Sequence, residues 1–210
     1  MKAEKRRDFD HEAIQWDQNP GRVKLAKDVA DEIIRMINPI KDMDVLDFGC
    51  GTGLVTLHLQ PYVGSIVGAD SSKGMLSVLE GKVKERGPTN VSTQLVDFEK
   101  GEHVAGMYSL IVSSMTVHHV PDTGALFKLW YDLLKPEGRV CFADLDVEDG
   151  SFHTDNTGVF HFGFDREKLK ALLRESGFSD IRDTTAATVV RDVEGKGKKE
   201  FSVFLIVAKR

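Results

Sequence analysis

The 210-residue sequence contains only two cysteines, Cys50 and Cys141, which are too few for a disulfide framework. Both are expected to be free thiols in a reducing compartment, which indicates a cytoplasmic protein. No apolar run is long enough to span a bilayer, and residues 1–13 are charged and lack the apolar stretch of a signal peptide. The sequence therefore predicts neither a secreted nor a membrane-spanning protein.

An excess of positive charge is also missing. The 28 Lys and Arg residues are outnumbered by 33 Asp and Glu residues, which gives a formal net charge of −5 at pH 7. There is no basic stripe, so nucleic acid is not an expected partner. Internal repeats and low-complexity tracts are absent too. We expect a single domain over residues 1–210, whose oligomeric state the sequence does not indicate.

Glycine, in contrast, is concentrated in the segment VLDFGCGTG, residues 45–53. A short apolar run typical of a buried strand is followed at once by Gly49, Gly51 and Gly53. Glycine costs conformational entropy, so three glycines in five positions require a reason. A strand, a glycine loop and a helix start form a site for a polar or anionic ligand, because backbone N–H groups and the helix dipole face it.

An acidic residue ends the next predicted strand. Asp70 follows Gly51 by 70 − 51 = 19 residues, close to the spacing at which dinucleotide-binding proteins place a carboxylate on the ribose hydroxyls. The glycine spacing is G-x-G-x-G, however, and not the dinucleotide fingerprint G-x-G-x-x-G. The loop and Asp70 together predict an adenosine-type cofactor. The alternative is a tight strand–helix turn beside an ordinary aspartate.

Hydrophobic spacing predicts alternating strands and helices along most of the chain. Helices are expected at 21–37, 54–60, 72–86, 122–135 and 165–177, and strands at 44–48, 65–70, 90–97, 108–114 and 138–144. Such alternation predicts a parallel sheet with helices on both faces. Two final strands, 184–193 and 200–210, form a hairpin, so the last strand should be antiparallel. We divide the chain into an N-terminal flap and helix (1–38) and a core (43–210).

Five segments resemble the class I S-adenosylmethionine (SAM) dependent methyltransferases, in particular the small-molecule branch similar to the ubiquinone and menaquinone methyltransferases. The segments are VLDFGCGTG, IVGADSSKGML, LVDFEK, YSLIVSSMTVHHV and LLKPEGRVCFADLD. The resemblance implies a Rossmann-like, doubly wound α/β fold with seven strands in the order 3-2-1-4-5-7-6 and strand 7 antiparallel. It also implies an enzyme that transfers a methyl group from SAM to a small molecule and releases S-adenosylhomocysteine.

The same resemblance assigns cofactor contacts to individual residues. These are Asp47, Gly49, Cys50, Gly51, Ser113 and Ser114 for the methionine part, with Asp47 near its ammonium group, Asp70 for the ribose, Ser71 and Met75 beside ribose and adenine, and Asp97 and Phe98 for the adenine. Ordinary alternatives exist. Met75 and Phe98 also suit the core, Asp97 suits a cap at the end of a strand, and the two serines suit a strand terminus.

Four histidines are expected beyond the fourth and fifth strands: His118, His119, His153 and His161. Methyl transfer from SAM is an in-line displacement, so a base is needed only when the acceptor must lose a proton. His118 and His119 are the candidate catalytic residues on the acceptor side, and the sequence does not decide between them. A metal site is not expected, because adjacent histidines diverge and no Cys or Glu completes a ligand set.

The N-terminal flap contributes two residues with open roles. Trp16 either closes over the cofactor and excludes water or anchors the flap to the core. Arg22 either binds a carboxylate or is a solvated charge. Two other functions also stay open at this point: a SAM-binding protein without catalysis, and a nicotinamide-dependent oxidoreductase, against which the missing third glycine of the fingerprint counts.

Overall fold

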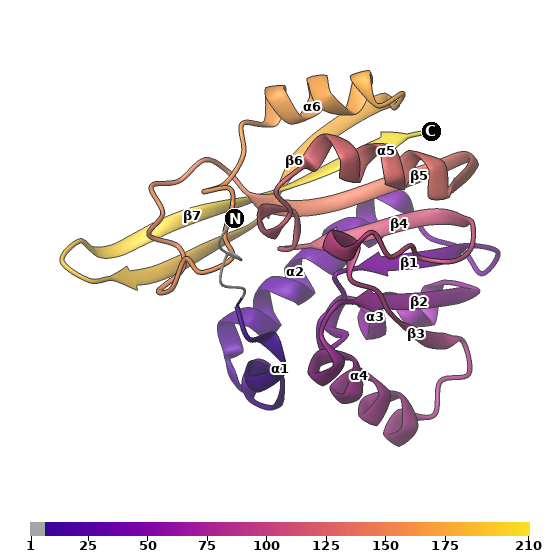
Figure 1. The fold of residues 1–210 in the computed structure, drawn as a ribbon, viewed down its shortest axis with the longest axis horizontal. Helices are drawn as coiled ribbons and strands as arrows, with labels where there is room; N and C mark the ends of the chain where they lie inside the picture. Colours follow the sequence, from indigo (N-terminus) through magenta and orange to yellow (C-terminus); the bar gives the residue numbers. More distant parts are fainter. Residues whose placement is uncertain (1–6) are drawn as a thin grey trace.

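The computed structural model describes residues 7–210, so the first six residues of the predicted flap lie outside the described residues. Its centre is a seven-stranded sheet with the strand order β3-β2-β1-β4-β5-β7-β6 (Figure 1). Strands β1 to β5 are mutually parallel, and β7 is antiparallel to both β5 and β6. The predicted fold class, strand order and antiparallel last strand are confirmed.

The boundaries of the elements follow the predicted alternation. The strands are β1 (Asp44–Phe48), β2 (Ser65–Asp70), β3 (Val91–Leu95), β4 (Tyr108–Ser114), β5 (Leu134–Leu145), β6 (Ser179–Val193) and β7 (Gly197–Lys209). The α-helices are α1 (Phe9–Glu12), α2 (Pro20–Ile37), α3 (Leu54–Leu59), α4 (Lys73–Arg86), α5 (Thr123–Leu133) and α6 (Arg166–Glu175). Short 3₁₀ helices are η1 (Ala13–Gln18), η2 (Gln60–Tyr62), η3 (Phe98–Lys100) and η4 (Val117–His119). Within residues 7–210, no helix combines the length and apolarity needed to cross a membrane.

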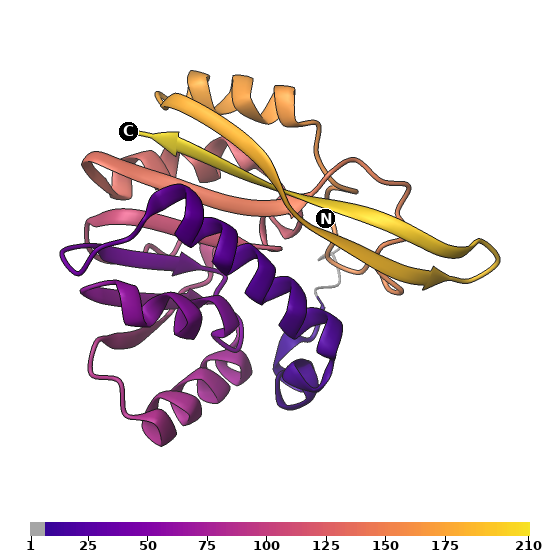
Figure 2. The same ribbon diagram turned by 180° about the vertical axis from the view of Figure 1, so that it is seen from behind.

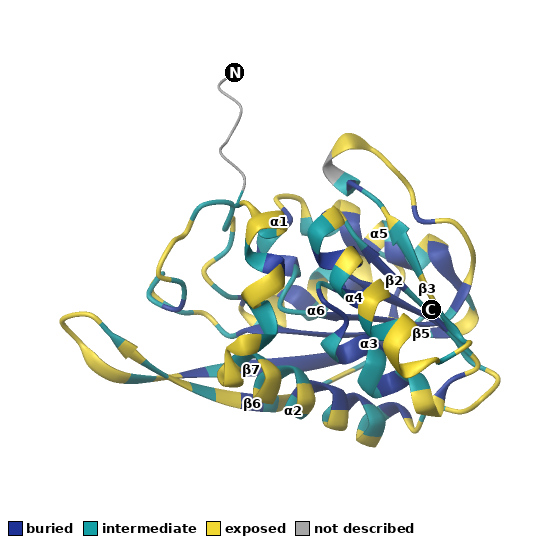
Figure 3. Ribbon diagram, turned by 90° about the horizontal axis from the view of Figure 1, so that it is seen from below, coloured by how far each residue is buried: buried dark blue, intermediate teal, exposed yellow. Residues whose placement is uncertain are grey.

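Both faces of the sheet are buried, because successive side chains of a strand point to opposite faces. In β1, Val45 packs in the core with residues of α2 and α3, whereas Leu46 packs in the core with residues of α5 and α6. In β5, Cys141 packs in the same part of the core as Val45, and Phe142 packs in the same part as Leu46. The helices therefore cover the sheet from both sides (Figures 1 and 2), and buried residues are concentrated in the central strands β1, β4, β5 and β7 (Figure 3).

Side-chain caps fix the ends of the helices that flank the sheet. The Asn19 side chain accepts hydrogen bonds from the backbone N–H groups of the first turn of α2, at 2.9 and 3.3 Å. The same helix ends at Asn38, which adopts a left-handed φ of 49° just before Pro39. Asp165 caps α6 through its Oδ1, which accepts hydrogen bonds from the N–H groups of Glu167 and Lys168.

Several predicted boundaries were wrong: β5 begins at Leu134 and not at residue 138, and β6 begins at Ser179 and not at residue 184. Apolar spacing assigned Leu134 and Lys135 to the helix over residues 122–135, but α5 ends at Leu133. Leu134 instead begins β5, where it is paired with Tyr108 of β4. Pro136 supplies the physical reason, since the residue before a proline is disfavoured in the α conformation.

The residues before α2 form two short helices, α1 and η1, at the edge of the sheet where the parallel strands end (Figure 1). Asp10 Oδ1 accepts hydrogen bonds from Ser72 Oγ at 2.5 Å and from the Gly74 N–H at 2.7 Å. Asp17 Oδ1 accepts one from Thr52 Oγ1 at 2.6 Å. The N-terminal segment is therefore attached both to the start of α4 and to the glycine loop.

Candidate functional site

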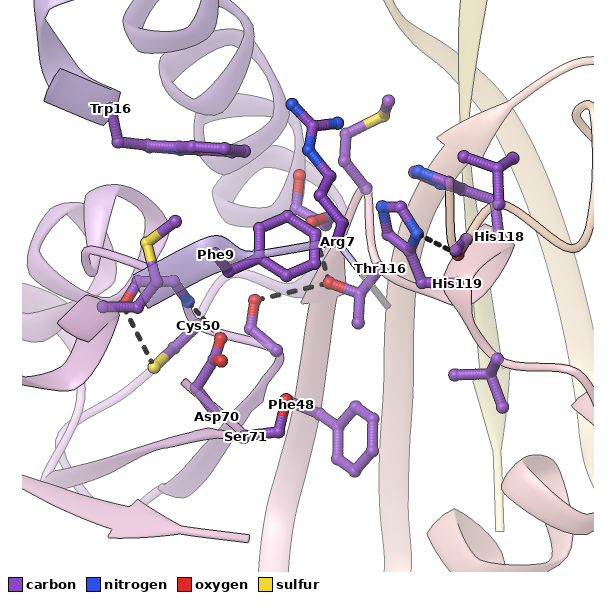
Figure 4. Close-up of a pocket in the computed structure, with 18 of the residues that line it drawn as sticks. Arg7, Phe9, Trp16, Phe48, Cys50, Asp70, Ser71, Thr116, His118 and His119 are labelled. Carbon is purple, nitrogen blue, oxygen red and sulfur yellow. Dashed lines mark hydrogen bonds between the residues drawn. The ribbon is translucent and has the colours of Figure 1, made fainter. Parts of the chain in front are cut away.

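A pocket of about 840 Å³ lies at the carboxyl ends of β1, β2 and β4. The N-terminal helices and residues 146–165, here called the covering loop, also line it. The glycine-loop end of the pocket is the part around Gly51 and Asp70. The histidine end is the part around His118 and His119, and Figure 4 shows it together with Asp70. Open α/β sheets bind their ligands at this edge.

Different features of the structure require glycine at the three glycine positions of the loop. All lie in the left-handed region, with φ of 71° at Gly49, 53° at Gly51 and 79° at Gly53. A Cβ on Gly49 would lie 2.3 Å from the Thr116 side chain, and one on Gly53 would lie 2.3 Å from Leu79. A Cβ on Gly51 would meet only Met75 Sδ, 4.0 Å away, apart from the adjacent residues, and Gly51 lines the pocket. Two glycines thus permit close packing of the chain, while Gly51 leaves the backbone open to a ligand.

The Asp70 carboxylate is oriented by the loop that precedes it in sequence. The Gly51 N–H donates to Oδ2 at 2.8 Å, and the Ser72 N–H donates to Oδ1 at 2.9 Å. Burial raises the pKa of this carboxyl even though both N–H groups favour its ionised form. Each oxygen keeps a second lone pair that can accept a ligand hydroxyl. The geometry fits the predicted ribose contact.

Asp47 is a buried carboxylate at the same end of the pocket, only 1% exposed. Thr56 Oγ1 donates a hydrogen bond to its Oδ2 at 2.5 Å. Burial raises the pKa of Asp47 to about 7, against the opposing effect of the Thr56 hydrogen bond and with added repulsion from Asp70. A desolvated carboxylate of this kind is stabilised by a cationic partner, which is what the ammonium group of the predicted cofactor would provide.

The remaining cofactor-binding candidates are not all at the pocket. Six of them line it: Cys50, Ser71, Met75, Asp97, Phe98 and Ser114. Phe98 also packs edge-on against Phe48, with ring centroids 6.2 Å apart, so it both packs against the core and lines the pocket. Ser113 is not among the lining residues. It is buried, and its Oγ donates to the Phe48 carbonyl at 2.8 Å, which ties β4 to β1.

His118 is held by the buried carboxylate of Asp144 near the end of β5. Its Nδ1 lies 2.8 Å from Asp144 Oδ1, and its backbone N–H donates to Oδ2 at 3.1 Å. Burial alone would raise the pKa of Asp144, but the charge and hydrogen bonds of His118 bring it below its usual value. Asp144 is then an ionised acceptor, so Nδ1 of His118 carries the proton. Nε2 is left as an acceptor, buried and without a hydrogen-bond partner among the described residues.

Three histidine rings gather at this end of the pocket. The ring centroid of His118 lies 4.1 Å from that of His119 and 5.0 Å from that of His153. His119 Nδ1 donates to the Gly158 carbonyl at 2.6 Å. Burial and the charge of His118 lower the pKa of His119 to about 4 and that of His153 to about 3, so both rings are neutral at pH 7.

The fourth histidine is elsewhere. His161 does not line the pocket, and its Nε2 lies 2.9 Å from the Val120 carbonyl, which helps to hold the covering loop on η4. Among the side chains that the structure describes, no group of three or more His, Cys, Asp or Glu is arranged to hold a metal ion.

Aromatic side chains of the N-terminal helices cover the histidine end. The Phe9 ring contacts His119 edge-on at 5.3 Å, so His119 lies between Phe9 and His118 (Figure 4). The ring centroid of Trp16 lies 6.0 Å from that of Phe9. The Arg22 guanidinium stacks on the Trp16 ring, 3.7 Å from its centre. Trp16 and Arg22 both line the pocket, so neither is simply a solvated surface residue.

Sequence reasoning missed several lining residues, among them Arg7, Phe9, Thr116 and Arg191. Arg7 lies in a charged run and Arg191 in a strand of the hairpin, and neither stands in a motif. The other two carried a usable signal: Thr116 stands in the segment YSLIVSSMTVHHV, and Phe9 is an aromatic residue in an otherwise charged segment. Arg191 reaches the site only because β6 passes the covering loop, which local sequence does not reveal.

Similarity to known proteins defines the class. A SAM dependent methyltransferase of Aquifex aeolicus superposes with a TM-score of 0.69 at 18% identity, covering 97% of this chain and 99% of that one. The fold is therefore that of the class I SAM-dependent methyltransferases, as the sequence resemblance implied, and SAM is the cofactor of that class. A family model described as a methyltransferase domain matches residues 22–182. The chain belongs to this methyltransferase domain family.

Two curated relatives share substantial identity. An uncharacterized methyltransferase of Schizosaccharomyces pombe is 34% identical over 187 residues, which cover 81% of this chain and 64% of that protein. A ubiquinone biosynthesis O-methyltransferase of Nitrosococcus oceani is 30% identical over 142 residues, covering 66% of this chain and 60% of that protein. The chain thus spans less than two thirds of the length of these relatives.

Proposed function

We propose that the protein transfers the methyl group of SAM to a small-molecule acceptor and releases S-adenosylhomocysteine. One observation carries this proposal: a single pocket joins the glycine loop and Asp70 at one end to the Asp144–His118 pair at the other. Its volume of about 840 Å³ is in the range of small-molecule sites. Family membership supports the same activity.

Each end of the pocket has its own part in the proposed reaction. SAM supplies a methyl group on a positively charged sulfur, and transfer mainly requires that acceptor and methyl be held in line in a dry site. We assign Asp47 to the ammonium group and Asp70 to the ribose hydroxyls. Met75 and Phe98 are assigned to the adenine. Phe9 and Trp16 would exclude water from the reacting atoms.

We further propose that His118 is the general base for an acceptor that must lose a proton. One relative is an O-methyltransferase by name, and a hydroxyl acceptor carries such a proton. With Nδ1–H held by Asp144, the free Nε2 lone pair can accept the proton, and the carboxylate stabilises the resulting imidazolium. His119, with its pKa lowered to about 4, is a weaker base, and we assign it to orienting the acceptor.

Incubation with SAM labelled in its methyl group and a low-molecular-weight cell extract tests the proposed activity. We expect S-adenosylhomocysteine and a labelled small molecule, and neither with heat-denatured protein. Binding of SAM without transfer of label would instead support a non-catalytic SAM-binding protein. Label found only on macromolecules would contradict a small-molecule acceptor.

We also propose that the chain acts as a single domain in the cytoplasm. The contacts of Asp10 and Asp17 with α4 and the glycine loop support one cooperative unit. Cys50 and Cys141 are both buried free thiols, which suits a reducing compartment. Two separate thermal unfolding transitions would contradict the single domain. A fluorescent fusion of the protein that is found in the medium or in an organelle would contradict the cytoplasmic location.

A further inference from the structure

The charged side chains that line the pocket are separated by sign. Asp47, Asp70 and Asp97 line the glycine-loop end, and no other Asp or Glu is among the described lining residues. Three arginines line the rest of the pocket: Arg7, Arg22 and Arg191. The pKa values of His119 and His153 are both lowered, so these two rings add no charge of their own at pH 7. Positive potential is therefore concentrated where the proposed acceptor would bind.

Arg191 is the arginine with the strongest need for an anionic partner. It extends from β6 over the Phe152 ring, 4.0 Å from its centre, and Nη1 donates to the Phe152 carbonyl at 2.6 Å. Among the described residues, no carboxylate is bonded to it. Burial, together with repulsion from Arg22 and Arg7, lowers its pKa. A half-buried cation with cationic neighbours is costly unless an anion completes the site.

Arg7 and Arg22 differ from Arg191 because they share a carboxylate. Arg7 donates two hydrogen bonds to Glu12, at 2.6 and 2.8 Å, and Arg22 Nη2 lies 3.5 Å from Glu12 Oε2. Asp155 of the covering loop is close enough to Glu12 to oppose the lowering of its pKa. Neither acid lines the pocket. These two arginines are thus partly compensated, and Arg191 is the guanidinium left for a ligand.

Arg191 is also connected to the proposed base. The Phe152 ring beneath it contacts His153 at 4.9 Å, and His153 contacts His118 at 5.0 Å. SAM brings a single carboxylate, which one guanidinium can match, so at least two of the three remain for another ligand. With Nη1 occupied by a carbonyl, four of the five N–H donors of Arg191 remain, enough for a bidentate contact.

We propose that the methyl acceptor carries an anionic group, a carboxylate or a phosphate, and that Arg191 binds this group while Arg7 and Arg22 add attractive potential. The inference rests on the proposed function, because it names the substrate class of that same pocket. Arginine suits both anions, since its planar fork matches their oxygens. An anionic group bound at Arg191 would leave the rest of the acceptor at the histidine end of the pocket.

The labelled products of the extract incubation provide the first test. They are applied to an anion-exchange column at pH 8, with and without prior phosphatase treatment. We expect the label to be retained by the column. Loss of retention after phosphatase identifies a phosphate ester, and unchanged retention identifies a carboxylate. A labelled product that is neutral or cationic overturns this inference but leaves the proposed function intact, whereas no labelled product at all overturns both.

Arg191→Gln, assayed with the purified acceptor, tests whether Arg191 binds the anionic group of the acceptor. We expect KM for the acceptor to rise about 10- to 100-fold, because a charge-assisted contact is lost, while KM for SAM is unchanged. Arg191→Lys, which keeps the charge and much of the packing, should lose less. Arg182→Gln is the matched control: it lies on the same strand, is 54% exposed and pairs with Asp180. A rise in KM for SAM and not for the acceptor would mean that Arg191 binds the SAM carboxylate, and the proposal would fall.

Discussion

Asp47 and His118 are both buried at the pocket, but their surroundings prepare them for different tasks. Asp47 has a neutral hydroxyl as its partner, so burial dominates and brings its pKa to about 7. His118 has the ionised carboxylate of Asp144 at Nδ1, which leaves Nε2 as an acceptor without a hydrogen-bond partner among the described residues. Asp47 is therefore suited to receive a cationic group, and His118 to accept a proton at Nε2.

The pKa of Asp47 predicts how SAM binding depends on pH. Ionised Asp47, present above a pKa of about 7, attracts the SAM ammonium group, which itself persists only below about pH 8. Affinity should therefore be highest between these values and fall up to about tenfold per pH unit on the acid side. Calorimetric titrations from pH 5.5 to 9 measure this. In Asp47→Asn the acid-side fall should disappear, and a wild-type affinity that is level down to pH 5.5 would contradict the assignment.

His118→Asn tests the proposed base with little disturbance of the fold. The Asn amide can still donate to Asp144, so the buried carboxylate is not left alone, but it has no lone pair equivalent to Nε2. For an acceptor that loses a proton, kcat should fall about 10²- to 10⁴-fold while SAM affinity is retained. The increase of rate with pH that a base histidine produces should vanish as well.

His161→Gln is the control for this substitution. His161 lies outside the pocket lining, and Gln keeps a donor for the Val120 carbonyl. Its activity and pH profile should match those of the wild type. Full activity with an unaltered pH profile in His118→Asn would show that catalysis depends on positioning alone.

At the scale of elements, the three glycines of the loop between β1 and α3 have different roles in packing and in ligand binding. In Gly53→Ala the new methyl would meet buried Leu79, so the free energy of unfolding should fall by about 2–4 kcal/mol, from backbone strain plus overpacking. Gly87→Ala has a similar φ of 74° and no neighbour within 4 Å, so it should cost only about 1–2 kcal/mol. Thermal or denaturant unfolding compares the two variants.

Gly51→Ala separates ligand binding from packing in the same loop. Its stability should match that of Gly87→Ala, because the site is open within the protein. SAM affinity, measured by calorimetry, should nevertheless drop at least about tenfold, since the methyl group occupies space that we assign to the cofactor. An unchanged affinity would show that nothing approaches the backbone at Gly51.

The elements that we assign to the cofactor were easier to predict than those that we assign to the acceptor. Gly51 and Asp70 stand in a motif because a strand, a loop and a helix start must follow one another at fixed spacing. Leu134 was misplaced because apolar residues at the junction of helix and strand fit both periods. The covering loop has no hydrophobic period, so the sequence predicted that His153 lies at the same edge as His118 but did not predict that the two rings come within 5.0 Å of each other.

At the scale of the whole molecule, the two ends of the pocket come from different parts of the chain. The glycine-loop end is built from β1 to β3 and the turns that follow them, which are close in sequence. The histidine end unites the N-terminal helices, η4, the covering loop and β6. Long-range assembly of this kind explains why Arg7 and Arg191 could not be recognised as neighbours before the fold was known.

Calorimetric titration of the protein with SAM, compared with NAD, is the most direct test of the central claim that the glycine-loop end is a SAM site. The open backbone at Gly51, the desolvated carboxylate of Asp47 and the oriented carboxylate of Asp70 lead us to predict one bound SAM per chain and no measurable binding of NAD. Binding of NAD without binding of SAM would contradict the account.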